Sequence, residues 1–515
     1  MAFTSRWLIP VWLAALLVAG CTAQSAPTPT PAPTETATRT PPPTVTPTAT
    51  LTPEPTLTPT VTLTPSITPS PTLTPAPTGT PQPVTAFTYD NWSFIDAPAG
   101  LAARLINPQV AFLNTNNRDT VGDPRTPSPS TNMQTLYYVS PDGGAPTTIL
   151  TMTAQTGDQV WVAPSGNAFA WMRLENNPGS DGLYLVDLTL DTPISGRVLP
   201  VTSLVVRGIA SPPSWAPDGS RVALTVEGGY STEIFTVGRD GSTPTNLTQN
   251  GSNDFWPVWS PDGAQIAFVS DRAICPTWAP GQPNTCDGTA NPPGPGGYVY
   301  VTTPGGTATM QISQQWVQGP PVWVNPRQIA YASGDPAFGD PERSLWIADV
   351  ITGETREVSL DRGDDALKLS ESWSPNGRQV VYQAPGAAGN ELVLANIDGT
   401  QTGRIADLNF TRYGVAMDWS PDGSNLVVGG IDGQCPYGII VLNNQFQSVA
   451  RGNPPPSMCE PSYSPNGTRL AFTGVNPRLD GRVDIYVANA NGFGAQNLTA
   501  NLRGQIQLLG WVGGQ

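Results

Sequence analysis

Short β-rich runs alternate with turn-forming residues along most of the chain, and one five-residue phrase marks the pattern. In its clearest copy, Trp259-Ser260-Pro261-Asp262-Gly263, an apolar strand follows at residues 266–269. Proline presets φ for a tight turn, Asp or Asn tolerates the strained conformation beside it, and Gly takes positive φ without steric cost. The aromatic residues that begin the clear or degenerate copies, with a late tryptophan one period further on, are called anchor residues: Trp215, Trp259, Trp323, Trp373, Trp419, Tyr463 and Trp511.

Each copy predicts a unit of four strands. A second β-rich run, such as 233–237, 391–394 or 484–487, ends in its own Asp-Gly or Asn-Gly hairpin. A Leu-Thr segment follows, and one further strand leads into the next anchor residue. Proline recurs two residues before the anchor residue, at Pro213, Pro257, Pro321 and Pro461. Because proline lacks a ladder donor, it favours an edge strand, which is what the innermost strand of a propeller blade is.

Counted from about residue 105, units begin near 105, 162, 215, 259, 323, 373, 419 and 463, where the weak copy at Val162 is included. The period predicts an all-β protein, a propeller of eight four-stranded blades. Seven blades remain the alternative if the degenerate first unit is an N-terminal extension. We expect residues 505–511 to pair with the first blade near Val110 and Leu136 and so close the ring through both chain ends.

The pattern W-S-P-D-G-x-x-I-A-F, with a later D-I-Y-V and L-T, resembles the WD40-like (PD40) repeat of TolB-like propellers over roughly residues 105–511. The resemblance implies the fold and leaves the function open, because propellers host many roles. The small N-terminal α/β domain that precedes the propeller in TolB has no counterpart in this pattern, so the resemblance does not carry over a role in the Tol–Pal system.

The N-terminus predicts export. Residues 1–20 hold one arginine and an apolar run too short to span a bilayer with ordinary flanks, which is typical of a signal peptide. The segment ending in Gly20-Cys21 resembles a bacterial lipobox, and this implies cleavage before Cys21 and its lipidation; an ordinary secretory signal is the alternative. Residues 21–87 are rich in Thr and Pro and predict a disordered stalk, which is either O-glycosylated or an inert spacer. Residues 88–515 form the predicted propeller domain.

Charge and cysteine content narrow the partners. The net charge is −15 with 24 basic residues, which argues against nucleic acid and anionic lipid surfaces as binding partners. We therefore expect the protein to contact the membrane through its lipid anchor alone. Besides Cys21 there are four cysteines, which allow three disulfide connectivities. We favour Cys275–Cys286 and Cys435–Cys459. A Cys₄ metal site is the alternative, but no C-x-x-C spacing supports it, so we expect no metal and no cofactor.

The absence of histidine excludes Ser-His-Asp and Cys-His catalysis. A carboxylate pair at the channel is the remaining enzymatic chemistry. Its candidates are Asp254, Glu371, Asp418 and Glu460, which we interpret instead as solvated rim or turn residues because their offsets from the anchor residues differ.

Two hypotheses follow. The first is a monomeric, lipid-anchored propeller on the outer face of a bacterial membrane, which binds an envelope protein or glycan without catalysis. Its contact face is predicted in the longest loops, 114–135, 274–297 and 334–343. The alternative is a carboxylate-dependent glycosidase or lyase with its site at the channel mouth.

Overall fold

The computed structural model describes the chain from residue 105 to residue 514, with internal gaps. The described ranges are 105–115, 132–154, 159–173, 181–189, 194–200, 205–206, 209–227, 232–249, 252–274, 296–334, 344–358, 369–386, 389–405, 415–431, 435, 440–451, 456–475 and 482–514. Every regular element in these ranges is a β-strand. None of the described segments forms a helix long and apolar enough to cross a membrane.

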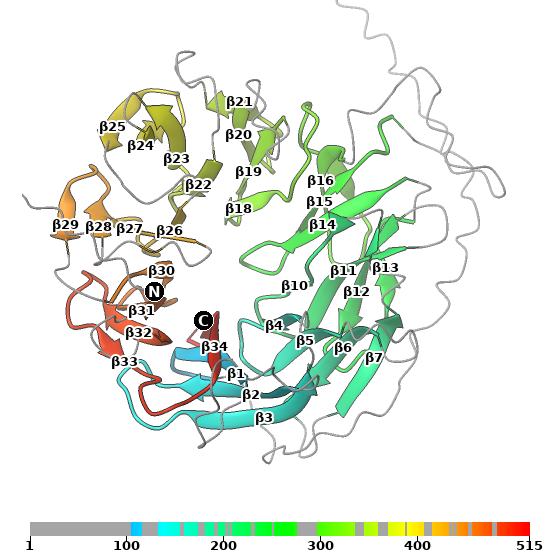
Figure 1. Ribbon diagram of the computed structural model, residues 1–515. Helices are drawn as coiled ribbons and strands as arrows, with labels where there is room; N and C mark the ends of the chain where they lie inside the picture. Colours follow the sequence, from blue (N-terminus) through cyan, green and yellow to red (C-terminus); the bar gives the residue numbers. More distant parts are fainter. Residues whose placement is uncertain are drawn as a thin grey trace, which may run out of the picture. The chain divides into compact units, whose positions relative to one another are not determined.

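Eight four-stranded antiparallel sheets, the blades, are arranged in a ring (Figure 1). From innermost to outermost strand, the first four blades are blade 1, β34 (Gln505–Val512), β1 (Gln109–Thr115), β2 (Asn132–Val139) and β3 (Thr147–Ala154); blade 2, β4 (Gln159–Val162), β5 (Ala168–Arg173), β6 (Gly182–Asp187) and β7 (Ile194–Pro200); blade 3, β10 (Ser214–Trp215), β11 (Arg221–Glu227), β12 (Thr232–Gly238) and β13 (Thr245–Asn246); and blade 4, β14 (Asp254–Trp259), β15 (Ile266–Ser270), β16 (Tyr298–Thr302) and β17 (Thr309–Gln311).

The second half of the ring has the same order of strands. It consists of blade 5, β18 (Val322–Asn325), β19 (Gln328–Ser333), β20 (Ser344–Asp349) and β21 (Thr355–Val358); blade 6, β22 (Leu369–Trp373), β23 (Gln379–Gly386), β24 (Gly389–Asn396) and β25 (Gln401–Ile405); blade 7, β26 (Ala416–Trp419), β27 (Asn425–Gly429), β28 (Ile440–Asn443) and β29 (Ser448–Arg451); and blade 8, β30 (Cys459–Tyr463), β31 (Arg469–Val475), β32 (Val483–Asn489) and β33 (Gln496–Asn497). A two-stranded sheet of β8 (Val205–Val206) and β9 (Ile209–Ala210) lies in the connection between blades 2 and 3.

The eight-bladed prediction is confirmed and the seven-bladed alternative is wrong. Each anchor residue lies in the innermost strand of its blade, and the weak copy at Val162 ends the innermost strand of blade 2. The last strand, β34, pairs antiparallel with β1, with Trp511 opposite Val110, so blade 1 takes strands from both ends of the chain. The expected direct pairing near Leu136 is corrected: Leu136 belongs to β2, which pairs with the other edge of β1.

The hydrophobic core is divided into eight clusters, and each cluster joins two neighbouring blades. Between blades 8 and 1, for example, Ala471 and Ile485 pack with Val110 and Phe112. The other seven clusters bridge the other seven pairs of neighbours in the same way. Burial of each large apolar side chain stabilises the fold by roughly 1.5–3 kcal/mol, so packing at the seams between blades contributes substantially to stability.

The recurring turn is stabilised by its own side chains. In blade 4, Ser260 Oγ donates to Asp262 Oδ1 (2.6 Å) and accepts the main-chain N–H of Gln265 (2.9 Å). Gly263 has φ +70°, a conformation that favours glycine. The equivalent serines in blades 6, 7 and 8 make the same bond to Asn376, Asp422 and Asn466. The turn phrase therefore fixes how the innermost strand of a blade reverses into the second.

The Leu-Thr segment fixes the outermost strand. In blade 8, Thr499 Oγ1 accepts the N–H of Ile485 (3.0 Å) and donates to Asp484 Oδ1 (2.8 Å). In blade 3, Thr248 makes the same two bonds, to the N–H of Ile234 and to a Glu233 carboxylate oxygen. The acid at the second position of the third strand and the Thr that follows the fourth strand thus form one buried hydrogen-bonded unit.

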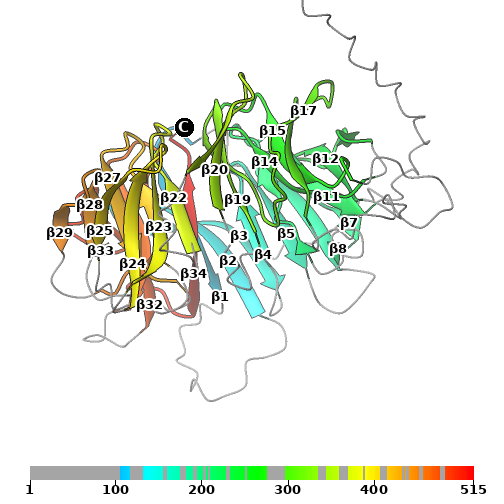
Figure 2. The same cartoon turned by 90° about the horizontal axis from the view of Figure 1, so that it is seen from above.

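Antiparallel strand order gives the ring two different faces, at the two ends of the strands seen from the side in Figure 2. We call the face that carries the first-to-second and third-to-fourth connections the turn face. The other, with the second-to-third and blade-to-blade connections, is the loop face. On the turn face the longest connection between strands runs from residue 140 to 146, whereas on the loop face one runs from residue 271 to 297.

Candidate functional site

The three longest loops named from the sequence all arise on the loop face. They join β1 to β2, β15 to β16 and β19 to β20, and each is a second-to-third connection of its blade. Residues 116–131, 275–295 and 335–343 lie outside the described residues, but the strand ends that carry them are described. Because second and third strands meet at one end of every blade, these connections leave the ring on the same side.

A buried ion pair lies where the connection between β15 and β16 begins. Asp254 is fully buried, and its Oδ1 lies 2.9 Å from Nη2 of Arg272, whose side chain is 15% exposed. Arg272 Nε also donates to Ser270 Oγ (2.8 Å). The guanidinium lies over the rings of Phe268 and Tyr300, at 5.0 and 4.8 Å from their centroids, which adds cation–π stabilisation. This arrangement fixes the residue from which the long connection departs.

Burial raises the pKa of Asp254, and the nearby charge of Arg272 opposes that shift. The interpretation of all four acids as solvated rim or turn residues is therefore wrong for Asp254. Its local geometry explains the difference. Trp256, just before Pro257, has φ +49°, and the pairing of β14 with β15 shifts register there. This bulge interrupts the alternation of side chains that a simple count from the anchor residue assumes.

Asp418 lies one residue before the anchor residue of blade 7 and faces blade 8. Its Oδ2 accepts the main-chain N–H of Tyr463 at 2.7 Å. Burial raises the pKa of Asp418 to about 6, against the opposing hydrogen bonds from the N–H groups of Tyr463 and Trp419. Ser214 occupies the same place in blade 3, where its Oγ accepts the N–H of Trp259 (3.1 Å). Asp418 therefore fills a structural position between blades and carries a carboxylate that resists ionisation.

The other two candidate acids lie in different blades. Glu371 is half-buried in β22 of blade 6, and Glu460 is exposed in β30 of blade 8, where it has φ +50° just before Pro461. Asp254 and Asp418 belong to blades 4 and 7, so the four carboxylates come from four blades. Within the described ranges no hydrogen bond joins two of them, and no three potential metal-binding side chains of the Cys, Asp or Glu type gather. The geometry does not support the carboxylate enzyme.

One of the two favoured disulfides is present. Cys435, in the second-to-third connection of blade 7, is bonded to Cys459, the first residue of β30 in blade 8, with a Cα–Cα distance of 5.0 Å. Main-chain bonds lie beside it, because Gly430 N donates to Met458 O (3.0 Å) and accepts at its own oxygen from Glu460 N (3.0 Å). The bridge thus covalently joins two blades at the loop face. Cys275 and Cys286, like Cys21, lie outside the described residues.

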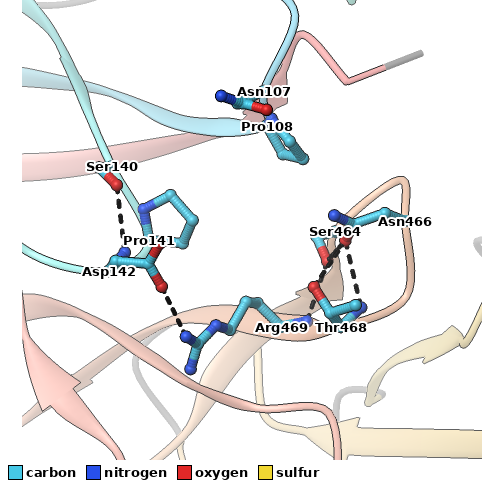
Figure 3. Close-up of a pocket in the computed structure, with 9 residues that line it drawn as sticks. All are labelled: Asn107, Pro108, Ser140, Pro141, Asp142, Ser464, Asn466, Thr468 and Arg469. Carbon is cyan, nitrogen blue, oxygen red and sulfur yellow. Dashed lines mark hydrogen bonds and ion pairs between the residues drawn. The ribbon is translucent and has the colours of Figure 1, made fainter.

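A polar pocket lies on the turn face at the seam between blades 8 and 1. Its volume is about 450 Å³. Figure 3 shows its lining residues, among which Asp142 of blade 1 and Arg469 of blade 8 form an ion pair of 2.6 Å across the seam. Asn107 and Pro108 complete the wall on the side of blade 1. The pattern search missed this pocket, because no single segment contains it.

One wall of this pocket is a turn whose sequence matches the recurring turn phrase. Ser140-Pro141-Asp142-Gly143 matches the recurring phrase, but it joins the third strand of blade 1 to the fourth rather than the first to the second. Ser140 Oγ accepts the N–H of Asp142 (3.2 Å), and this positions the carboxylate toward Arg469. The sequence signal for this turn is a Ser-Pro-Asp-Gly motif that lies outside the regular spacing of the anchor residues.

Comparison with known proteins supports the repeat family. A family model described as "TolB beta propeller domain" (PD40) matches residues 125–277. A curated relative, the "Tol-Pal system protein TolB" of Desulfosudis oleivorans, is 27% identical over 126 residues, which cover 19% of this chain and 27% of that protein. The chain thus spans about a quarter of the length of this relative.

Solved structures are similar at lower levels. TolB from Acinetobacter baumannii shares 20% identity, with a TM-score of 0.30, over 58% of this chain and 63% of that one. The dihydro-heme d1 dehydrogenase NirN shares 12% identity, with a TM-score of 0.48, over 83% of this chain and 80% of that chain. A eukaryotic initiation factor shares 11% identity, with a TM-score of 0.46, over 78% of this chain and 98% of that chain. At this level the likenesses bear on no functional assignment.

Proposed function

Because this chain is a TolB-like β-propeller of the PD40 family, we propose that it is an exported, lipid-anchored scaffold that binds an envelope protein through its loop face, without catalysis. The single observation that carries the proposal is the asymmetry of the two faces. All three long predicted loops depart from the loop face, and the turn face holds short connections. A rigid ring with variable loops gathered on one side is the usual arrangement of a recognition module.

The covalent chemistry supports export. Disulfides persist in oxidising compartments and are rare in the cytosol, and Cys435–Cys459 joins two blades of this chain. Export agrees with the apolar run and Cys21 at the N-terminus. The relative from Desulfosudis oleivorans is named as a Tol-Pal system protein, and we extend to this chain only the envelope as its place of action.

The point of attachment also favours the loop face as the binding face. The chain enters the ring at Leu105 on the turn face, where Leu105 O accepts the N–H of Gly514 (3.0 Å). The first described residue, Leu105, therefore lies on the face opposite the strand ends that carry the long loops. A tether that enters the ring at this residue would leave the loop face free for a partner.

The binding test compares the two faces in the full-length protein. Cross-linking in native membranes, affinity capture and mass spectrometry would be applied to wild type, to a variant with residues 276–294 replaced by a short Gly-Ser linker and Cys275 replaced by serine, and to Ile351→Ser. Ile351 is a matched control, because it is 74% exposed in a turn-face connection. We expect an envelope protein captured by wild type and the control and lost by the loop variant. Equal capture by all three would exclude this loop as the contact.

The lipid anchor has its own test. Metabolic labelling with a tritiated fatty acid should label the wild type and leave Cys21→Ala unlabelled, with the variant released to the soluble envelope fraction. If wild type stays unlabelled while being exported, an ordinary secretory signal explains the N-terminus. That result would leave the loop-face proposal intact.

A further inference from the structure

The pocket at the seam of blades 8 and 1 contains polar groups that the fold does not use. Asn107 is exposed, and its side-chain amide has no hydrogen-bond partner in the described structure. Asn466 Oδ1 is occupied by Ser464 and Thr468, whereas its Nδ2 is not bonded within the described residues. Turn formation accounts for one end of this amide and leaves the other directed to solvent-accessible space.

The charged pair of the pocket also has bonding capacity left over. Arg469 uses Nη2 on Asp142 Oδ1 and Nη1 on Asn489 Oδ1, both at 2.6 Å. A guanidinium carries five N–H groups, so three of them remain for a ligand. The second carboxylate oxygen of Asp142, whose side chain is 73% exposed, also makes no bond within the described ranges. The pocket therefore offers donors and acceptors side by side (Figure 3).

The charges that line the pocket disfavour an ionic ligand. Arg469 and Asp142 neutralise each other across the pocket, so neither an anion nor a cation gains a net Coulombic attraction there. The whole chain, at −15, additionally disfavours anions. A neutral ligand whose own groups both donate and accept matches this lining. Hydroxyl groups have that property, since each supplies one donor and two acceptor lone pairs.

Two exposed apolar side chains belong to segments that adjoin pocket-lining residues in the chain or are hydrogen-bonded to them. Phe493 is 55% exposed and belongs to the turn that begins at Asn489, the residue bonded to Arg469. Ile106, 88% exposed, precedes Asn107 in the chain. An exposed aromatic ring offers a flat apolar surface, on which the C–H face of a sugar ring can pack. The volume of about 450 Å³ falls within the range of small-ligand sites, roughly 300–1,000 Å³.

We propose that this seam pocket is a binding site for a neutral carbohydrate of one or two sugar units. It is separate from the protein-binding loop face and lies at the opposite end of the strands. Because Asp142 belongs to blade 1 and Arg469 to blade 8, a ligand that contacts both binds only the closed ring. Binding therefore stabilises ring closure by linkage.

The test uses the full chain and a named set of probes. Saturation-transfer difference NMR and isothermal calorimetry would be run with cellobiose, maltose and N,N′-diacetylchitobiose, and with digalacturonate as an anionic comparison. At least one neutral disaccharide should bind and raise the melting temperature, and digalacturonate should not. Asn107→Ala and Arg469→Ala should each weaken that binding at least tenfold.

Arg221→Ala provides the matched control. Arg221 follows the same turn phrase in blade 3, but among the described residues its side chain bonds within its own blade, to Thr236, Thr243 and Thr245. Its variant should bind the sugar as wild type does, and so should the loop-face variant with residues 276–294 replaced. The proposal is overturned if no neutral disaccharide binds, if only the anionic sugar binds, or if affinity is unchanged in both Asn107→Ala and Arg469→Ala. None of these outcomes touches the loop-face test.

Discussion

The indole N–H of Trp511 donates a 3.1 Å hydrogen bond to the main-chain oxygen of Ser462, the residue before the anchor residue of blade 8. Three other anchor residues make the equivalent contact to the preceding blade: Trp215 to Trp161 O, Trp323 to Val258 O, and Trp419 to Ser372 O. The last strand of the chain thus repeats, at the ring closure, the contact that joins blades within the continuous chain. The closing seam is built like an interior one.

The equivalence of the seams can be measured with tryptophan variants. Trp511→Phe keeps most of the packing and loses the bond to Ser462, so it should cost about 1 kcal/mol of unfolding free energy. Trp511→Ala also loses the indole packing and should cost about 3 kcal/mol. Both values come from urea denaturation of the full chain. Trp419→Phe and Trp419→Ala are the controls at an interior seam. If the C-terminal strand only docks loosely, Trp511→Ala will leave the unfolding free energy nearly unchanged, whereas Trp419→Ala will lower it.

Asp418 predicts a pH-dependent stability. Its pKa is raised to about 6 in the folded protein, from 3.8 for the free side chain, because burial disfavours the carboxylate. The stability that the protonated acid provides is complete below about pH 4 and is lost as pH rises through 6. Asp418→Asn keeps an acceptor for the N–H of Tyr463 and removes the charge. We expect the variant to match wild type at pH 4 and to be more stable by roughly 2–3 kcal/mol at pH 8.

Asp422 supplies the opposite control for that measurement. Ser420 and Ser424 donate hydrogen bonds to its carboxylate and lower its pKa, with Ser420 the largest cause. Ionised Asp422 therefore stabilises the fold above about pH 4, and this contribution is lost as pH falls. Asp422→Asn should be equal to or less stable than wild type at pH 8, and asparagine fills the same turn position at Asn376 and Asn466. Parallel pH profiles for the Asp418 variant and wild type would refute the assignment.

The Cys435–Cys459 bridge should stabilise the seam of blades 7 and 8. Its closed loop, with a sequence separation of 24, corresponds to roughly 3–4 kcal/mol in the chain-entropy model. The double variant Cys435→Ser/Cys459→Ser should lower the unfolding free energy by about that amount. Peptide mapping of the non-reduced wild type should recover the cross-linked pair. Alkylation of either thiol in the folded, oxidised protein would show that the bridge is absent.

Blade number could be predicted from the sequence because each repeat carries its own turn chemistry. The copy at Val162 illustrates this, since it lacks both the aromatic anchor residue and the acid. Gly166 nevertheless keeps φ +75°, and Ser165 donates to Asn167 Oδ1 at 2.6 Å. Local bonds of this kind form whatever the neighbouring blades do. The pairing of the two chain ends was predictable for the same reason, because the last unit supplied an innermost strand with no strands to follow it.

The polar sites were harder to predict because they depend on residues distant in the chain. Asp142 and Arg469, which meet across the seam pocket, are separated by 327 positions. The partner of Asp254 is also not evident from spacing, since the bulge at Trp256 changes which way the strand's side chains alternate. Sequence periodicity reports which residues share a position in the repeat. It does not report which side chains of two blades meet.

Removing one partner of the Asp254–Arg272 pair should lower the unfolding free energy strongly, and removing both partners should lower it by less than the sum of the two single changes. Asp254→Asn leaves a largely buried guanidinium without its carboxylate, and Arg272→Met leaves a fully buried acid without its cation. Loss of one partner of such a pair costs about 3–5 kcal/mol. The double variant should cost clearly less than the sum, because neither charge is then left uncompensated.

A double-mutant cycle measured by urea denaturation at pH 7 tests this coupling. The surface pair Arg327–Asp349, 2.5 Å apart with Arg327 57% exposed, is the control and should show a coupling below about 1 kcal/mol. If the Asp254–Arg272 coupling is equally small, the buried pair contributes no more than a solvated one. Arg272→Lys separates charge from shape, since it restores a cation but loses the planar group that lies over Phe268 and Tyr300. Partial rescue by lysine would show that both the ion pair and the ring contacts fix the residue from which the long loop departs.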